Sequence, residues 1–171
     1  VIVNSAGAIL TALHVVAGFE EVTVTFADGT ETVAAVIGAE TDIDIAVLQP
    51  EELPEIFAAA TLGNPGAVRV GDEAYVVGAP LGLAGSISAG VVSGLNRTYT
   101  LPNSNLELER LIQVDAAVNA GASGGPLLNR NGEVVGIVVA LINPTQADTF
   151  IGIGLAVRID TAGGAAGLPL Q

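Results

Sequence analysis

Short apolar segments separated by turn residues follow one another along almost the whole chain. In residues 21–28, valines alternate with threonines and lead to an Asp28-Gly29 pair, and apolar residues resume at 33–37, which together predict a β-hairpin. Asn131-Gly132 predicts a second hairpin in the same way. About ten such segments occur, separated by turns at intervals of roughly 8–12 residues. No long helical period interrupts them, so the chain is predicted to be all-β, a sandwich or a pair of barrels.

Four further stretches carry expectations about the organisation of the chain. Residues 11–16 predict a short apolar turn or helical loop. Residues 51–57 are acidic, follow Pro50 and contain Pro54. They predict a surface connection between two halves. The polar residues 96–107 predict a surface loop, and residues 161–171 predict a tail of small residues.

The composition restricts the chemistry and the partners of the chain. With 18 acidic and 5 basic residues the net charge is −13, so nucleic acid would be repelled and is not expected as a partner. The hydrophobic fraction of 50% exceeds that of disordered chains, yet no apolar run reaches the roughly 18 residues of a membrane span. Cysteine and lysine are both absent, which excludes thiol nucleophiles, disulfides and Ser–Lys pairs.

Ser123 lies in the glycine-rich stretch Gly121-Ala122-Ser123-Gly124-Gly125, between two apolar segments. Glycines allow the backbone to turn tightly there, so that successive N–H groups can point at one spot, as in the oxyanion hole of an acyl-transfer enzyme. The alternative interpretation is a glycine-rich β-turn with an incidental serine. Short motifs of this kind match by chance often enough that the rest of the chain must decide between the two.

The order of residues along the chain limits which serine mechanism is possible. The chain has one histidine, His14, so any Ser–His pair must use it as the base, although a lone histidine among apolar neighbours can also be a packed core residue. The α/β-hydrolase elbow needs its histidine after the serine, and the subtilisin order needs an acid before the histidine, whereas the first acid here is Glu20. Only the order His, Asp, Ser remains.

The third member of such a site is expected to be Asp44. It lies among Ile43, Ile45 and Ala46, where an unpaired carboxylate is unfavourable and an imidazole N–H is the best available partner. An exposed turn suits Asp42 better. A metal site built from Asp42 and Asp44 is the weaker alternative, because two carboxylates do not complete a coordination shell, and no metal or other cofactor is expected.

Four motifs in this order resemble those of the HtrA (DegP/Deg) serine proteases. They span nearly the whole chain, and the intervals of 30 residues from His14 to Asp44 and 79 residues from Asp44 to Ser123 are also similar to that family. The motifs are Thr11-Ala12-Leu13-His14-Val15-Val16, Asp42-Ile43-Asp44-Ile45-Ala46-Val47-Leu48, Gln113-Val114-Asp115-Ala116-Ala117 with Gly121-Ala122-Ser123-Gly124-Gly125-Pro126-Leu127, and Gly152-Ile153-Gly154-Leu155-Ala156-Val157.

The resemblance implies a chymotrypsin-like double antiparallel β-barrel with the site in the cleft between the barrels. Residues 1–171 would form a single trypsin-like protease domain, with an N-terminal barrel of about residues 1–55, a C-terminal barrel of about 60–160 and no PDZ domain in this chain. Ser123 would be the nucleophile, His14 the general base and Asp44 the group that orients it. The N–H groups of Gly121 and Ser123 would form the oxyanion hole.

The resemblance also implies a substrate preference. Counting six residues before the nucleophile, as in chymotrypsin-like enzymes, makes Ala117 the floor of the S1 pocket, with the strand Val139, Ala140 and Leu141 as its wall. Alanine offers no carboxylate to a basic side chain, and the branched residues narrow the pocket. A preference for small aliphatic P1 residues such as Val, Ala or Leu is therefore expected.

The implied function is ATP-independent endopeptidase cleavage of unfolded or damaged proteins through an acyl-enzyme. The alternative is a catalytically silent or ligand-activated HtrA-like chaperone that binds exposed apolar segments, and an esterase on the same fold is a third possibility. The family also implies an extracytoplasmic location, in a bacterial periplasm or at the cell surface. A homotrimer is expected through contacts made by a segment preceding Val1.

Overall fold

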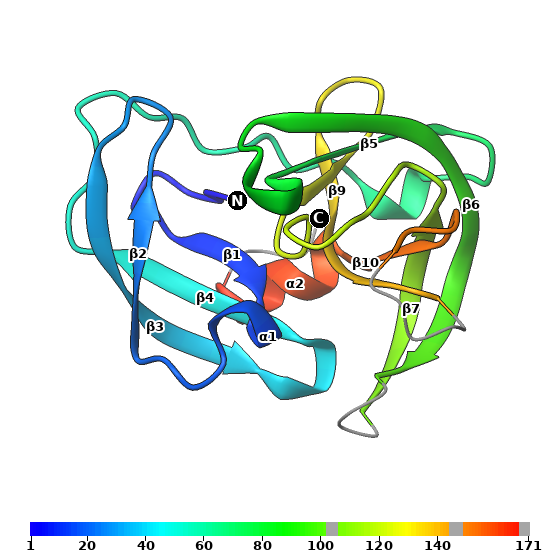
Figure 1. The fold of residues 1–171 in the computed structure, drawn as a ribbon, viewed down its shortest axis with the longest axis horizontal. Coiled ribbons are helices and arrows are strands. Elements are labelled where there is room, and N and C mark those ends of the chain that lie inside the picture. Colours follow the sequence, from blue (N-terminus) through cyan, green and yellow to red (C-terminus); the bar gives the residue numbers. More distant parts are fainter. Residues whose placement is uncertain (102–105, 144–148, 168–171) are drawn as a thin grey trace.

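The computed structural model describes residues 1–101, 106–143 and 149–167, and its elements are predominantly strands (Figure 1). The strands are β1 (Ile9–Ala12), β2 (Glu21–Thr25), β3 (Glu31–Glu40), β4 (Ile45–Pro50), β5 (Glu73–Gly78), β6 (Ser86–Thr100), β7 (Glu107–Val114), β8 (Pro126–Leu128), β9 (Val134–Leu141) and β10 (Gly154–Arg158). The helices are α1 (Leu13–Val16) and α2 (Ile159–Ala165), with the short 3₁₀ turns η1 (Thr41–Ile43), η2 (Pro65–Ala67) and η3 (Pro80–Gly82). The all-β prediction is confirmed.

The N-terminal half is an antiparallel sheet in the order β1-β4-β3-β2. Its β2–β3 hairpin is the one predicted from Asp28-Gly29: Glu21 pairs with Ala35, Thr25 pairs with Glu31, and the Asp28 carboxylate accepts a hydrogen bond from the Thr30 N–H at 2.9 Å. β1 and β2 are the two edges and do not pair with each other in the described residues. The half expected to be a barrel is thus an open, curled sheet.

The C-terminal half closes into a six-stranded barrel in the order β10-β7-β6-β5-β8-β9. The β8–β9 hairpin surrounds Asn131-Gly132 as predicted, and the Asn129 side chain stabilises its turn by accepting from the N–H groups of Asn131 and Glu133. The prediction of a surface loop over 96–107 was wrong at both ends, because β6 runs to Thr100 and β7 begins at Glu107. Residues 96–100 at the outer end of this hairpin are mostly exposed, and register shifts interrupt its pairing, which removes the alternation by which strands are recognised.

The predicted tail of small residues over 161–171 belongs in its first part to helix α2, and residues 168–171 lie outside the described residues. Ile159, Ala162 and Gly163 are buried on one face of this helix. Arg158 and Asp160 form an ion pair at 2.6 Å at its first turn. Two turns of helix rich in alanine and glycine are too short to give a periodic signal, so packing rather than propensity decides the structure here. In the part of the chain that the structure describes, no helix is long and apolar enough to cross a membrane.

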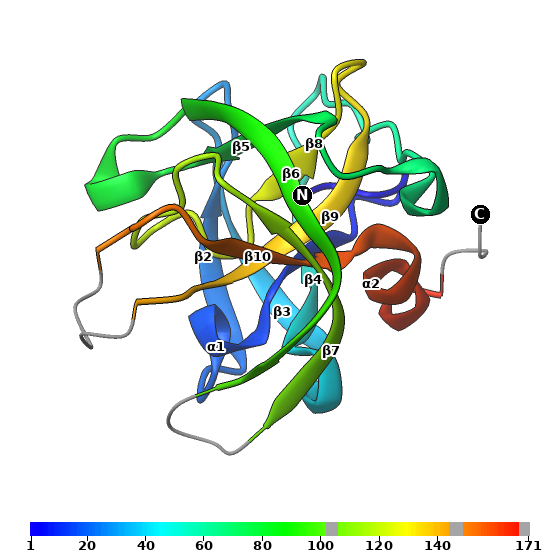
Figure 2. The ribbon, with the colours of Figure 1, turned by 90° about the vertical axis from the view of Figure 1, so that its right-hand side faces the viewer.

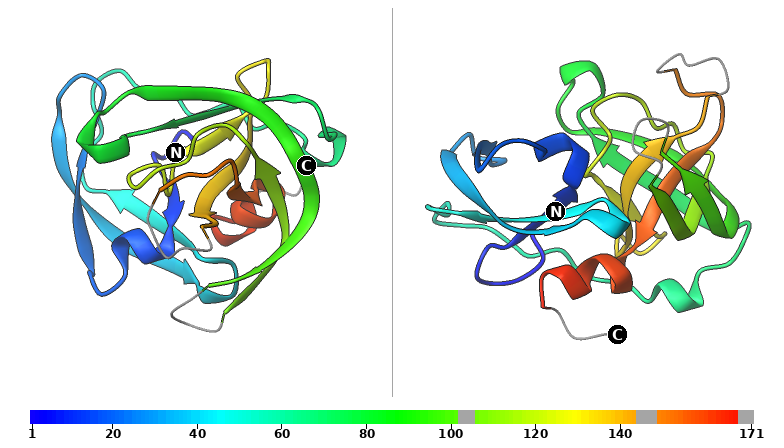
Figure 3. Two further views of the ribbon diagram at one scale, coloured as in Figure 1. Left: turned by 45° about the vertical axis from the view of Figure 1, so that its right-hand side comes forward. Right: turned by 90° about the horizontal axis from the view of Figure 1, so that it is seen from below.

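The two halves share a hydrophobic core. Leu10, Ile45 and Val47 of the sheet lie in one buried cluster with Leu111 and Ile137 of the barrel. Figure 3 shows the sheet and the barrel packed side by side, and helix α2 contacts strands of both. Residues that face each other across this junction are therefore held by the core as a whole.

Candidate active site

His14 and Asp44 are brought together by the pairing of β1 with β4. These strands run antiparallel with Ile9 opposite Leu48 and Ala12 opposite Ile45. Continued by one residue, the same register sets Leu13 opposite Asp44, and the Leu13 N–H donates to the Asp44 carbonyl at 2.9 Å. His14 follows in α1. Two residues that lie 30 positions apart are thus adjacent because their strands are paired at that end.

The Asp44 carboxylate uses both of its oxygens on His14. Oδ2 lies 2.6 Å from the imidazole Nδ1, and Oδ1 accepts from the His14 backbone N–H at 2.9 Å. The Asp44 side chain is 5% exposed, whereas that of His14 is 46% exposed. The hydrogen bond to Asp44 raises the pKa of His14 above its ordinary value of 6.5, against the smaller opposite effect of partial burial. A donating Nδ1–H leaves Nε2 as the free acceptor of the ring. Asp42, the alternative acid, is exposed.

Ser123 lies in the turn between β7 and β8. This turn contacts β9 and β1. The Gly124 N–H donates to the Val138 carbonyl at 2.8 Å, and the Val138 N–H donates to the Gly125 carbonyl at 2.9 Å. Gly124 has φ +81°, and a Cβ at this position would collide with the Thr11 hydroxyl of β1. The serine turn therefore packs directly against the strand that leads to His14, and only glycine fits at the contact.

A cleft of about 600 Å³ contains His14 and Ser123 together. Its lining comes from both halves: His14 and Val15 from α1, and the remaining residues from the barrel and its loops. Those are Tyr99, Leu101, Val118, Asn119, Ala120, Gly121, Ser123, Val139, Ala140 and Leu141. In the described residues the Ser123 hydroxyl makes no hydrogen bond to His14. A bond between a nucleophile and its base is often long in the absence of substrate.

The N–H groups of Gly121 and Ser123 have no protein partner in the described chain, whereas those of Ala122, Gly124 and Gly125 do. The Ala122 N–H donates to the Asn119 carbonyl, and the Gly125 N–H donates to the Ala122 carbonyl, at 2.9 and 3.0 Å. Gly121 has φ +97°, and both Gly121 and Ser123 line the cleft. The N–H groups on either side of Ala122 are therefore unpaired, and both belong to cleft-lining residues.

Val139, Ala140 and Leu141 line the cleft, as the predicted pocket wall requires, but Ala117 does not. Ala117 is exposed, its carbonyl accepts from the Ser88 hydroxyl at 2.8 Å, and it faces a separate cavity of about 90 Å³. The next residue, Val118, is 2% exposed and lines the cleft in its place. Sequence reasoning also missed Tyr99 and Leu101, because they lie in the stretch interpreted as a surface loop.

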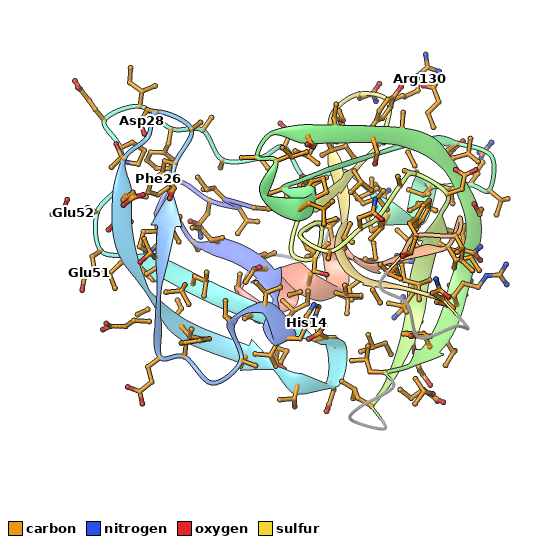
Figure 4. The ribbon with its side chains drawn as sticks, viewed as in Figure 1. His14, Phe26, Asp28, Glu51, Glu52 and Arg130 are labelled. Carbon is orange, nitrogen blue, oxygen red and sulfur yellow. The ribbon has the colours of Figure 1, made fainter. Side chains whose placement is uncertain are left out.

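Charge is distributed unevenly around this neutral cleft. The first 68 residues contain ten carboxylates and no lysine or arginine, and every one of the ten except Asp44 is exposed. Figure 4 shows His14 where the sheet meets the barrel, with Asp28, Glu51 and Glu52 at the outer end of the sheet. In residues 1–101, 106–143 and 149–167, no three His, Asp or Glu side chains gather closely enough to hold a metal ion.

The sheet packed on a barrel, with the His14–Asp44 pair and Ser123 at one cleft, points to one class of protein. The family model for the trypsin-like peptidase domain matches residues 1–137. The chain therefore belongs to the trypsin-like peptidase family.

Within that family the similar proteins are of the HtrA type. The serine protease HhoA of Synechocystis is 41% identical over 164 residues, which cover 94% of this chain and 40% of HhoA. Protease Do-like 1 of Arabidopsis thaliana, a chloroplast protein, is 36% identical over 161 residues, covering 94% of this chain and 36% of that protein. A DegP-like periplasmic serine endoprotease of Halomonas elongata is 39% identical over 163 residues, covering 94% and 32%. The chain thus spans about a third to two fifths of these relatives.

Solved structures agree with this assignment. The HtrA-type protease AlgW with a tripeptide is 34% identical, with a TM-score of 0.87 over 98% of this chain and 53% of that chain. Its variant with a decapeptide is 33% identical, again with a TM-score of 0.87 over 98% of this chain, and 49% of that chain. The resemblance to HtrA proteases and the predicted chymotrypsin-like fold are both confirmed.

Proposed function

We propose that this chain is the peptidase domain of a serine endopeptidase that cleaves unfolded or damaged proteins. The observation that carries the proposal is the Asp44–His14 hydrogen bond of 2.6 Å at the edge of a cleft that also contains Ser123. The family, and relatives named as serine proteases, support the same activity. Ser123 is the nucleophile, His14 the base, and Asp44 the residue that orients His14.

In the first half of the reaction, Ser123 Oγ attacks the carbonyl carbon of a peptide bond while Nε2 of His14 takes the hydroxyl proton. Asp44 holds Nδ1–H, which fixes the tautomer and stabilises the imidazolium that forms. The oxyanion accepts hydrogen bonds from the N–H groups of Gly121 and Ser123. The tetrahedral intermediate then collapses: the C=O re-forms, the C–N bond breaks, His14 gives its proton to the leaving amine, and an acyl-enzyme on Ser123 remains.

In the second half, a water molecule attacks the acyl carbon and His14 takes its proton. The same two N–H groups hold the second oxyanion. When it collapses, the C–O bond to Ser123 breaks, His14 returns the proton to Oγ, and the carboxylic acid product leaves. No metal or cofactor takes part in these steps.

The side chains that line the cleft support the proposed preference for small aliphatic residues at P1. Val118, Val139 and Leu141 supply branched, neutral side chains, and among the described residues the lining contains no carboxylate to bind a basic side chain. In this proposal Val118 takes the place that counting along the sequence assigned to Ala117. The extracytoplasmic location has the support of the relatives named as periplasmic. The trimer stays a prediction, which sedimentation of the protein would test.

Digestion of unfolded casein tests the proposal, with product ends read by mass spectrometry. The wild type is expected to cleave after Val, Ala or Leu, and Ser123→Ala is expected to be inactive. Ser93→Ala is the matched control, since Ser93 lies in β6 outside the cleft. Binding of casein without cleavage by a folded wild type would favour the chaperone alternative.

A further inference from the structure

The short turn η3 lies beside the serine turn. Figures 1 and 2 show the green turn between β5 and β6 next to the yellow-green loop that precedes β8. Two backbone hydrogen bonds join them: the Ala79 N–H donates to the Gly121 carbonyl, and the Leu81 N–H donates to the Ala120 carbonyl, each at 3.0 Å. The peptide group that contains the proposed oxyanion donor is therefore held from the side of η3.

The second of these bonds determines where the Gly121 N–H points. No peptide bond in the described residues is cis, and in a planar trans peptide the C=O and the following N–H point in opposite directions. Because the Ala120 carbonyl points at Leu81, the Gly121 N–H points away from η3. Rotation of this peptide would break the Leu81 bond and turn a carbonyl oxygen toward the place of the donor.

The residue that donates this hydrogen bond, Leu81, has an unusual backbone conformation. Its φ is 53° and its ψ is 28°, in the left-handed region that bulky residues rarely enter. Its side chain is 84% exposed, so packing of the side chain does not explain the conformation. Such outliers persist where the surrounding structure fixes them, and they concentrate at functional sites.

We propose that Leu81 is a positioning residue, whose left-handed backbone aims its N–H at the Ala120 carbonyl and so keeps the Gly121 N–H available to the oxyanion. The inference rests on the proposed function. Its consequence is that the oxyanion hole is formed in the resting protein, without a ligand to order it.

Two substitutions change the backbone preference of position 81 in opposite directions. Leu81→Val introduces a β-branched residue, which disfavours the left-handed region, whereas Leu81→Gly favours it, and both keep the N–H. Leu83→Val is the matched control, because Leu83 is an exposed leucine of the same loop with φ −81°. Thermal unfolding of each variant checks that the fold is retained.

Kinetics with a Val-P1 peptide provide the functional readout. Loss of an oxyanion donor lowers kcat by about 10²–10³, so Leu81→Val is expected to lower kcat by at least about tenfold with little change in KM. Its affinity for a peptide aldehyde, which forms a tetrahedral adduct, should fall in parallel, while the pH midpoint set by His14 stays the same. Leu81→Gly and Leu83→Val should keep kcat. Equal losses in both valine variants, or no loss in Leu81→Val, would overturn the proposal.

Amide hydrogen exchange tests the structural part independently of activity. The Leu81 N–H of the wild type is expected to exchange slowly, and this protection should be lost in Leu81→Val. An unprotected Leu81 N–H in an active wild type would sink this inference and leave the proposed function intact. A protected Leu81 N–H in a wild type that cleaves nothing would instead contradict the proposed function, and with it the role of Leu81 in catalysis.

Discussion

The imidazole Nδ1 of His14 lies 2.6 Å from Oδ2 of Asp44, and the His14 backbone N–H donates to the other oxygen of the same carboxylate at 2.9 Å. One buried carboxylate therefore fixes both the ring and the backbone of one residue. Because β1 and β4 set these residues side by side, both members of the pair come from the N-terminal half, whereas Ser123 comes from the C-terminal half.

Asp44→Asn should lower kcat by about four orders of magnitude, because an amide can hold the ring in the wrong tautomer and cannot stabilise the imidazolium. KM should change much less. Asp42→Asn is the matched control, since Asp42 is an exposed acid two residues away and should retain nearly full activity. Steady-state kinetics on one peptide measure both, and equal losses in the two variants would contradict the assignment of Asp44.

The pH dependence of activity should follow His14. Its pKa is raised by Asp44, and the base must be neutral, so kcat/KM should rise with pH with a midpoint above 6.5. A midpoint at or below that value in the wild type would mean that the hydrogen bond to Asp44 does not form in solution.

The same shift affects stability with the opposite sign. A pKa raised in the folded state stabilises the fold fully below the unfolded value of 6.5, and this contribution is lost as pH rises through the folded pKa. The difference in free energy of unfolding between wild type and His14→Gln, which cannot be protonated, should therefore shrink between pH 6 and 9. Urea denaturation at several pH values measures it, and a difference that grows with pH would be contrary to the account.

Val118→Ala should widen the proposed P1 pocket and shift the preference from Val toward Leu or Phe. One methylene in an apolar pocket changes discrimination by about 10- to 200-fold, so the ratio of kcat/KM for Leu over Val should rise by at least tenfold. Ala117→Gly, next to it but outside the cleft, should change this ratio little. The reverse result would restore the assignment made by counting residues.

Salt should stabilise the protein. Nine exposed carboxylates without a lysine or arginine in the first 68 residues repel one another, and ions screen that repulsion. Raising NaCl from 0.05 to 1 M should raise Tm by at least about 2–4 °C, which corresponds to roughly 1 kcal/mol for a chain of this size. Sucrose of equal osmolality separates screening from solute exclusion. A Tm that does not respond to NaCl would contradict this prediction.

The fold class and the His14–Asp44 pair could be predicted from the sequence because both depend on local patterns of residue types. Alternation of apolar and polar residues marks strands. Because the chain has one histidine and neither cysteine nor lysine, only the order His, Asp, Ser along the chain is possible for a serine site. The outer end of the β6–β7 hairpin could not be predicted, because residues 96–100 are mostly exposed and the register of the pairing shifts repeatedly.

Finer features depend on the path of the backbone through irregular turns. Val118 lines the cleft and Ala117 does not, because a shift of one residue reverses the direction of a side chain, and no sequence pattern sets that direction after β7. Leu81 carries no signal of its left-handed conformation, which glycine or asparagine would have suggested. The C-terminal barrel is closed by β10, and the N-terminal sheet stays open. Both features depend on pairing between strands that are distant in the sequence, which local patterns do not predict.

Labelling with a fluorophosphonate, followed by peptide mapping, tests the central claim most directly. The probe reacts with a serine only when a base activates it next to an oxyanion hole. The account predicts one adduct, on Ser123, in the wild type, and its loss in His14→Ala. An adduct on another serine, or none on a wild type with an intact thermal unfolding transition, would contradict it.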